Sequence, residues 1–422
     1  MMGFRSAANA VFGMVLGSGA QMVSNVVAAM AATAWLSLSE RGVMVTIMAI
    51  AGLSSVFGTL GVGAAFRARL PREELATGAL TASFVMAGAC FAAFAAALAA
   101  GAMLVLDATS SPGLATPPQL LAVVLATVGL AGLSVLADLR IANGRYASSG
   151  RWAALAALAG LAGLMASWLL FPASAVSLVL GQSAGVCFAL VLSAWAAVRS
   201  RLIGSSRPTR TSFGALVRTG VGMMVLPSSL ALLTRADRVI LEVTEPSSVV
   251  AIYALAATYV EVVRIVPTAI GQMASRAVAQ GVAFRKVLQL CAASGVASVL
   301  LGGAMVAMAA IATEPLFGAD YADAVVWALF LIPAEVGYAV LAVMNFALIG
   351  GMWSRSATAL GVAAAGLGVV AYVTGATFGG AVGLIVARDI TMLVVAAGAV
   401  VLAAVLFRRR RPLSAALSSR RF

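Results

Sequence analysis

The chain has 422 residues, of which 62% are hydrophobic and 10% are charged, and its mean hydropathy is +1.06. Soluble domains are about 45–50% apolar and about 25% charged, so this composition excludes a soluble fold. The net charge of +13 does not indicate nucleic-acid binding, because the basic residues occupy short segments between apolar runs without interleaved aromatic residues. The lack of histidine excludes metal binding by imidazole, and we predict no metal site, no cofactor and no catalytic residue.

The apolar residues form continuous runs and do not alternate with polar residues as they do in a membrane-spanning barrel. They therefore predict helices, each of which needs about 20 apolar residues to cross a membrane. The predicted fold is an all-α integral membrane protein of about twelve transmembrane helices. In chain order the runs are residues 10–36, 43–66, 77–106, 119–139, 152–171, 175–198, 219–243, 249–272, 287–312, 324–349, 356–377 and 380–407.

The charges between these runs predict the orientation of the chain. Of the 27 Lys and Arg residues, 22 fall on one side of the predicted membrane, and only Arg41 falls in a loop on the opposite side. Because basic loops are retained in the cytoplasm, both termini are predicted to be cytoplasmic. A helix count that was wrong by one would destroy this segregation, so the charges also support twelve helices.

The longest connection between runs, residues 199–218, is rich in Arg and Ser and lies at the middle of the chain. It predicts two six-helix lobes, an N-terminal lobe of residues 1–212 and a C-terminal lobe of residues 213–422 that ends in a basic cytoplasmic tail. Parallel six-helix repeats are an architecture that transporters use.

Charged residues inside the predicted spans are concentrated in the C-terminal half. A charge near the bilayer centre costs about 2.5–3.5 kcal/mol on insertion scales, so such residues usually pair with one another or face a cavity. Two interpretations are open: Arg–carboxylate pairs hold helices together, or the charges bind substrate or a coupling ion. The eight candidate residues are Arg235, Asp237, Arg238, Glu261, Arg264, Glu335, Arg388 and Asp389.

Three prolines lie inside spans of the same half: Pro227, Pro267 and Pro333. Each removes one helical hydrogen bond, which frees a carbonyl or lets the helix bend. They are therefore candidate hinges, although membrane helices also tolerate proline for packing alone.

Three stretches carry a resemblance to a known family. Residues 36–72 read LSLSERGVMVTIMAIAGLSSVFGTLGVGAAFRARLPR, residues 235–258 read RADRVILEVTEPSSVVAIYALAAT, and residues 317–335 read FGADYADAVVWALFLIPAE. In order and spacing they resemble the polysaccharide transporter branch, the O-antigen and lipid-linked oligosaccharide flippases, of the multidrug/oligosaccharidyl-lipid/polysaccharide (MOP) exporter superfamily. The resemblance covers nearly the whole chain.

That resemblance implies a MATE-like fold and a flippase, not an enzyme, in the bacterial cytoplasmic (inner) membrane. The flippase would move a lipid-linked oligosaccharide or polysaccharide precursor across the membrane by alternating access, as part of polysaccharide or lipopolysaccharide biosynthesis. Its partners would be an anionic diphosphate lipid, a coupling proton or cation, the surrounding membrane lipids and glycan-assembly proteins. Arginine side chains that face a central cavity would suit the diphosphate.

Two other function classes stay open. A cation-coupled multidrug exporter of the same superfamily would use carboxylates and aromatic residues for cationic drugs, but aromatic residues make up only 7% of this chain. A membrane polymerase or ligase of glycan assembly would need a large periplasmic loop with acid–base residues, and the longest predicted loop on that side has about a dozen residues. The flippase is therefore our leading hypothesis.

Overall fold

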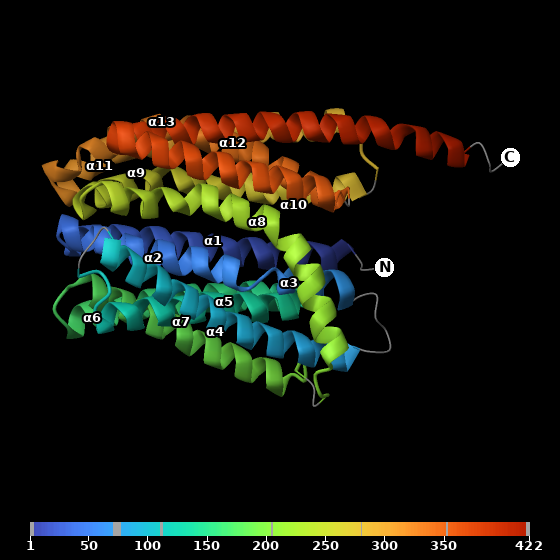
Figure 1. Cartoon of the computed structure of the whole chain (residues 1–422), viewed down its shortest axis with the longest axis horizontal. Coiled ribbons are helices and arrows are strands. Elements are labelled where there is room, and N and C mark those ends of the chain that lie inside the picture. The colour runs from blue at the N-terminus through green and yellow to red at the C-terminus, as the bar shows by residue number, and fades with distance from the viewer. Residues whose placement is uncertain are drawn as a thin grey trace. The chain divides into compact units, whose positions relative to one another are not determined.

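The computed structural model describes residues 4–70, 77–109, 113–203, 206–279, 281–351 and 353–418 (Figure 1). These residues are helical apart from short turns, and none of them forms a strand. The chain divides into two compact units, Met1–Leu255 and Ala256–Phe422. The predicted lobes meet instead at residues 212 and 213, and that boundary stays a prediction.

The first unit is a bundle in which α1 packs on α6, α6 on α7, α7 on α5, and α8 on α2 and α3. Small residues let α6 and α7 approach closely, since a Cβ added to Gly163 would lie 2.1 Å from the carbonyl oxygen of Gly181. The helices are α1 (Phe4–Trp35), α2 (Leu38–Gly58), α3 (Val62–Arg69), α4 (Thr77–Thr109), α5 (Pro117–Ala142), α6 (Tyr146–Leu170), α7 (Ala175–Arg199), α8 (Arg210–Thr244) and the first part of α9 (Ser247–Glu261).

The run at residues 43–66, which we predicted as one helix, is broken in the structure into α2 and α3. At the break Leu60 and Gly61 have positive φ angles of 47° and 63°. A Cβ on Gly61 would lie 2.5 Å from the carbonyl oxygen of Gly220 on α8. The left-handed conformation and the close approach of α8 both favour glycine here, and they end α2 before the apolar run ends.

The second unit contains the end of α9 and the elements that follow it. Within α13, Gly380 has φ 57° and ψ −143°, a conformation that only glycine adopts readily. The chain folds back there, since a Cβ added to Gly383 would lie 2.2 Å from the carbonyl oxygen of Gly375. The two predicted spans 356–377 and 380–407 are therefore confirmed as two helices on either side of this residue. The elements are η2 (Val262–Arg264), α10 (Ile265–Ala279), α11 (Phe284–Phe317), η3 (Ala319–Tyr321), α12 (Asp323–Gly350) and α13 (Ser354–Ser418).

Two of the predicted hinge prolines lie where the regular hydrogen bonding of a helix is interrupted. Pro333 lies inside α12, and Pro267 follows the 3-10 turn η2, which separates α9 from α10. Because proline has no N–H, Pro267 cannot donate to the carbonyl of Val263, and the helix tightens just before it. Pro227 lies within α8, but its side chain is outside the described set.

Nine helices in the described part of the chain are long and apolar enough to cross a membrane. They cover ten of the twelve predicted spans, because the segment Arg355–Arg409 contains two. The remaining two predicted spans correspond to α1 and α8. The predicted fold class, an all-α multi-pass membrane protein, is confirmed.

Candidate functional site

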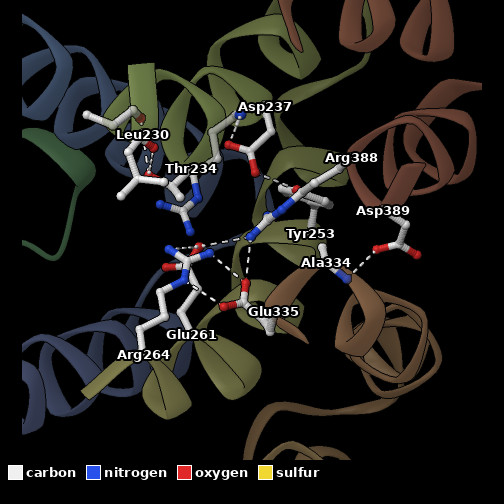
Figure 2. Close-up of polar contacts among 12 residues, drawn as sticks. Leu230, Thr234, Asp237, Tyr253, Glu261, Arg264, Ala334, Glu335, Arg388 and Asp389 are labelled. Carbon is white, nitrogen blue, oxygen red and sulfur yellow. Dashed lines mark hydrogen bonds and ion pairs between the residues drawn. The ribbon is translucent and has the colours of Figure 1, made fainter. Parts of the chain in front are cut away.

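Five of the eight predicted site residues gather in the second unit (Figure 2). Glu261 ends α9, Arg264 ends η2, Glu335 lies in α12, and Arg388 and Asp389 are adjacent in α13. These five residues form what we call the ion network of the second unit. Helices far apart in the sequence thus bring their intramembrane charges together.

Glu335 is the centre of this network and its side chain is 2% exposed. Arg264 binds it with both branches of its fork, Nε to Oε2 at 2.7 Å and Nη2 to Oε1 at 2.6 Å. Arg388, which is fully buried, donates from Nη2 to the same Oε1 at 2.8 Å. Two guanidinium groups therefore share one buried carboxylate, and these bonds are of the strong, charge-assisted kind.

Glu261 forms the outer and weaker part of the network. Its Oε1 lies 3.3 Å from Arg264 Nη1 and 3.6 Å from Arg388 Nη2, and its side chain is 21% exposed. Arg264 also lies over the ring of Tyr338, with Cζ 4.8 Å from the ring centroid. The guanidinium of Arg264 is thus held on three sides, by two carboxylates and an aromatic face.

Asp389 takes part in a different way, through the backbone of α12. Its Oδ1 accepts a hydrogen bond of 2.9 Å from the N–H of Ala334, which directly follows Pro333 (Figure 2). Because proline disturbs helical bonding around it, a side chain from another helix can reach this N–H. Asp389 is therefore held beside the network by the backbone of α12.

The other three predicted residues, Arg235, Asp237 and Arg238, lie on α8 in the first unit. Asp237 is fully buried and accepts hydrogen bonds from the hydroxyl of Tyr253 at 2.6 Å and from the N–H of Arg238 at 2.8 Å. Arg235 reaches α2, where a Cβ on Gly52 would lie 1.6 Å from its Nη1. Three of the eight predicted residues thus belong to the first unit and five to the second, and the role of all eight in binding or coupling stays a prediction.

Sequence reasoning missed Glu242, a buried carboxylate near the end of α8. Its Oε2 accepts from the hydroxyl of Thr46 on α2 at 2.9 Å, and its Oε1 accepts from the hydroxyl of Ser247 at 2.9 Å. The residue escaped notice because it lies one position from the end of the predicted span 219–243. The only signal in the sequence that could have indicated the burial of Glu242 was the polar residue Thr46 within the predicted span 43–66.

Arg140 was also missed, because it follows the predicted span 119–139 and was counted among the loop charges. The structure extends α5 to Ala142 and leaves Arg140 only 2% exposed. Its Nη2 donates to the carbonyl of Ser193 at 2.8 Å and its Nη1 to the carbonyl of Leu136 at 3.2 Å. Its Cζ lies 5.3 Å from the ring centroid of Trp152.

Arg140 lines a cavity of about 340 Å³ inside the first unit. The cavity is bounded by α1, α5, α6 and α7, with Met48 from α2, so its lining residues all belong to one unit. Its polar lining residues include Gln21, Asn25, Gln182 and Ser193.

Comparison with known proteins identifies the fold. No family model matches the chain, and no curated protein matches it. Among solved structures, the eukaryotic MATE transporter AtDTX14 is 14% identical, with 97% of this chain and 98% of that chain covered and a TM-score of 0.71. An outward-facing multidrug resistance MATE transporter of the MOP superfamily is 13% identical, with 96% of each chain covered and a TM-score of 0.62.

A third similar structure is a MOP superfamily transporter from Pyrococcus furiosus, which is described as having a binding pocket of reverse polarity and a different function. It is 13% identical, with 95% of this chain and 96% of that chain covered and a TM-score of 0.60. These likenesses confirm the predicted MATE-like fold over nearly the whole chain. At such low identity they establish the fold alone, and the polysaccharide branch of the superfamily stays a prediction.

Proposed function

We propose that the chain is an exporter that moves a lipid-linked oligosaccharide or polysaccharide precursor from the cytoplasmic to the periplasmic leaflet. The observation that carries this proposal is the ion network of the second unit, set in a fold that transporters share. Charges at membrane depth are costly and usually mark substrate or ion pathways. A protein that only filled space in the membrane would not need two buried guanidinium groups and three carboxylates.

Within this function, the ion network is the coupling site. Its carboxylates Glu261 and Asp389 are only partly buried, which suits uptake of a proton or a cation. Neutralising Glu261 would weaken its longer contacts with Arg264 and Arg388 before the short bonds to Glu335 are touched. Occupancy by a coupling ion would in this way alter the contacts among α9, α12 and α13, which alternating access requires.

The substrate of this exporter carries an anionic diphosphate. Arginine suits such a group, because the guanidinium fork can bind two phosphate oxygens at once. Arg235 and Arg238 lie one helical turn apart on α8, which places them on the same helix face. We assign this pair to contact with the diphosphate during transport.

Deletion of the gene tests the function directly. The deletion strain should accumulate lipid-linked oligosaccharide on the cytoplasmic leaflet and lose the mature surface or exported glycan. Normal glycan export together with greater sensitivity to cationic dyes would contradict the flippase and favour a multidrug exporter. That second candidate is supported by the likeness to a multidrug resistance MATE transporter and by the partly exposed carboxylate of Glu261 in the ion network.

The orientation that we propose, with both termini cytoplasmic, has its own test. Reporter fusions after Arg151, Arg210 and Lys286 should report a cytoplasmic location, whereas fusions at Gly113 and Gly318 should report a periplasmic one. These two glycines lie in turns between helices, so a fusion there disturbs little structure. A cytoplasmic signal at Gly113 would overturn the proposed topology.

A further inference from the structure

The cavity of the first unit contains a positive charge that no carboxylate among its described lining residues balances. Arg140 is buried beside the cavity, and the described residues that line it include no Asp or Glu. The two acceptors of Arg140, the carbonyls of Leu136 and Ser193, are neutral groups, so they satisfy hydrogen bonds without cancelling the charge. Burial of a cation without a counter-charge is costly, and an anion in the cavity would relieve that cost.

The rest of the lining suits a ligand rich in hydroxyl groups. Gln21 and Asn25 are four residues apart on α1 and therefore share one helix face, and Gln182 faces the same cavity from α7. The buried hydroxyl of Ser193 also lines the cavity and has no hydrogen-bond partner among the described residues. Amide and hydroxyl groups of this kind can both donate to and accept from sugar hydroxyls.

The size and the position of the cavity restrict which ligands it can hold. Small-molecule sites usually have volumes of about 300–1,000 Å³, so a cavity of this volume holds a headgroup and not a whole glycan or a lipid chain. Arg140 lies two residues before the end of α5, at the end that the loop charges place in the cytoplasm. The positive end of the cavity therefore faces the leaflet in which a newly made lipid-linked precursor would reside.

We propose that this cavity binds a phosphate-bearing sugar headgroup, with the phosphate on Arg140 and the sugar hydroxyls against Gln21, Asn25 and Gln182. The inference rests on the proposed function for its orientation, and it adds the place where the headgroup is first held. Phosphate next to a guanidinium gains charge-assisted hydrogen bonds. The ligand has two sources that share this chemistry, a sugar joined through phosphate to a polyprenyl lipid of the membrane and a soluble sugar phosphate.

Binding to the purified full-length chain tests the proposal. Glucose 1-phosphate, inorganic phosphate and glucose are titrated into the protein in detergent and followed by calorimetry. Glucosyl polyprenyl phosphate is tested in phosphatidylcholine nanodiscs by its effect on the unfolding temperature. We expect glucose 1-phosphate to bind more tightly than either phosphate or glucose alone. Stabilisation by glucosyl polyprenyl phosphate alone would assign the lipid as the source, and binding of glucose 1-phosphate alone would assign the soluble compound.

Matched variants identify the cavity as the site. Arg140→Gln should weaken binding by about tenfold or more, which is the loss expected for one charge-assisted contact. Arg199→Gln is the control, because Arg199 also lies over a tryptophan, Trp195, at 5.2 Å, but it is exposed and lies outside the cavity lining. Ala153→Leu fills the cavity without touching the charge, so it keeps the proposal testable if Arg140→Gln does not fold.

Equal affinity in wild type, Arg140→Gln and Ala153→Leu would overturn the proposal, and so would a wild-type chain that binds none of the phosphate compounds. Binding of glucose as tight as that of glucose 1-phosphate would also overturn it, because the charge would then play no part. These results are independent of the deletion experiment. A deletion strain that exports glycan normally would refute the proposed function and leave an Arg140-dependent anion site in place.

Discussion

Arg140 in the first unit and Arg388 in the second are both almost completely buried, at 2% and 0% exposure, but their surroundings differ. Arg388 donates to Glu335 at 2.8 Å and lies 3.6 Å from Glu261, so carboxylates cancel its charge. Arg140 donates to two backbone carbonyls and lies over Trp152, which leaves its charge in place. The charge of Arg388 in the second unit is therefore neutralised by carboxylates, whereas the charge of Arg140 in the first unit can bind an anion.

This difference predicts opposite responses to substitution. Where opposite charges are paired inside the protein, removal of one partner leaves the other uncompensated and the fold weakens strongly. Where a buried cation has only neutral acceptors, its removal costs a few hydrogen bonds and also relieves an unfavourable burial. The second unit should thus lose stability when its charges are changed, and the first unit should lose binding.

Glu335→Ala should have the largest effect on stability, because it leaves Arg264 and Arg388 without their shared carboxylate. We expect the free energy of unfolding to fall by about 3–5 kcal/mol. Reversible unfolding in mixed detergent micelles measures this change. The control is Glu314→Ala, which removes an exposed glutamate of α11 in the same unit. Equal stability of the two variants would contradict a network centred on Glu335.

Arg264→Lys should have the next largest effect. Lysine keeps the charge but cannot bind both oxygens of Glu335 at once, and it also loses the planar contact with Tyr338. The loss of one charge-assisted hydrogen bond predicts a fall of about 1.5–3 kcal/mol in the free energy of unfolding. Arg355→Lys, at an exposed position of the same unit, should change it very little. A fully stable Arg264→Lys chain would show that charge alone, without the fork, holds the network.

Arg140→Met decides whether the two buried arginines differ as we infer. The variant loses two hydrogen bonds to carbonyls but removes a buried charge, so we expect a loss of only about 1–2 kcal/mol in the free energy of unfolding. Arg199→Met serves as the matched control in the same unit. If Arg140→Met were as destabilising as Glu335→Ala, Arg140 would mainly stabilise the fold, as Arg388 does. The contrast between the two units would then disappear.

Asp389→Asn should have the smallest effect on stability. Asparagine retains an oxygen that accepts from the N–H of Ala334, so the free energy of unfolding should change by no more than about 1 kcal/mol. If Asp389 takes up the coupling ion, however, glycan export should fall sharply at unchanged protein level. Asp323→Asn, an exposed change at the start of α12, is the control for export. Full export by Asp389→Asn would remove this residue from the coupling site.

The fold was predictable because membrane helices are encoded in simple runs of apolar residues. The gap between the last two runs, residues 378–379, lies directly before Gly380, where the structure places the reversal. The break at Leu60 and Gly61 was not predictable, since the residues around it are as apolar as the rest of the run. That break depends on the approach of α8 through Gly220, a contact between segments about 160 residues apart.

The site was predictable only in part, for a related reason. Charges in the middle of a predicted span, such as Glu335 and Arg388, stand out because burial in lipid is costly. Glu242 and Arg140 lie at the ends of predicted spans, where a charge is ordinary, and only the packing of other helices shows that they are buried. The division of the eight residues between two units also depends on helix packing, which the spacing of the residues along the chain does not encode.

The reversal at Gly380 has a consequence for how the protein is made. The two arms of α13 are joined by almost no loop, so they enter the membrane as one helical hairpin after α12 is already in place. Arg388 and Asp389 lie in the second arm, and they meet Glu335 and Ala334 only once this hairpin has docked. Until then they carry the insertion cost of about 2.5–3.5 kcal/mol for each charge, which makes completion of the network a late step of biogenesis and a driving force for docking of the last hairpin.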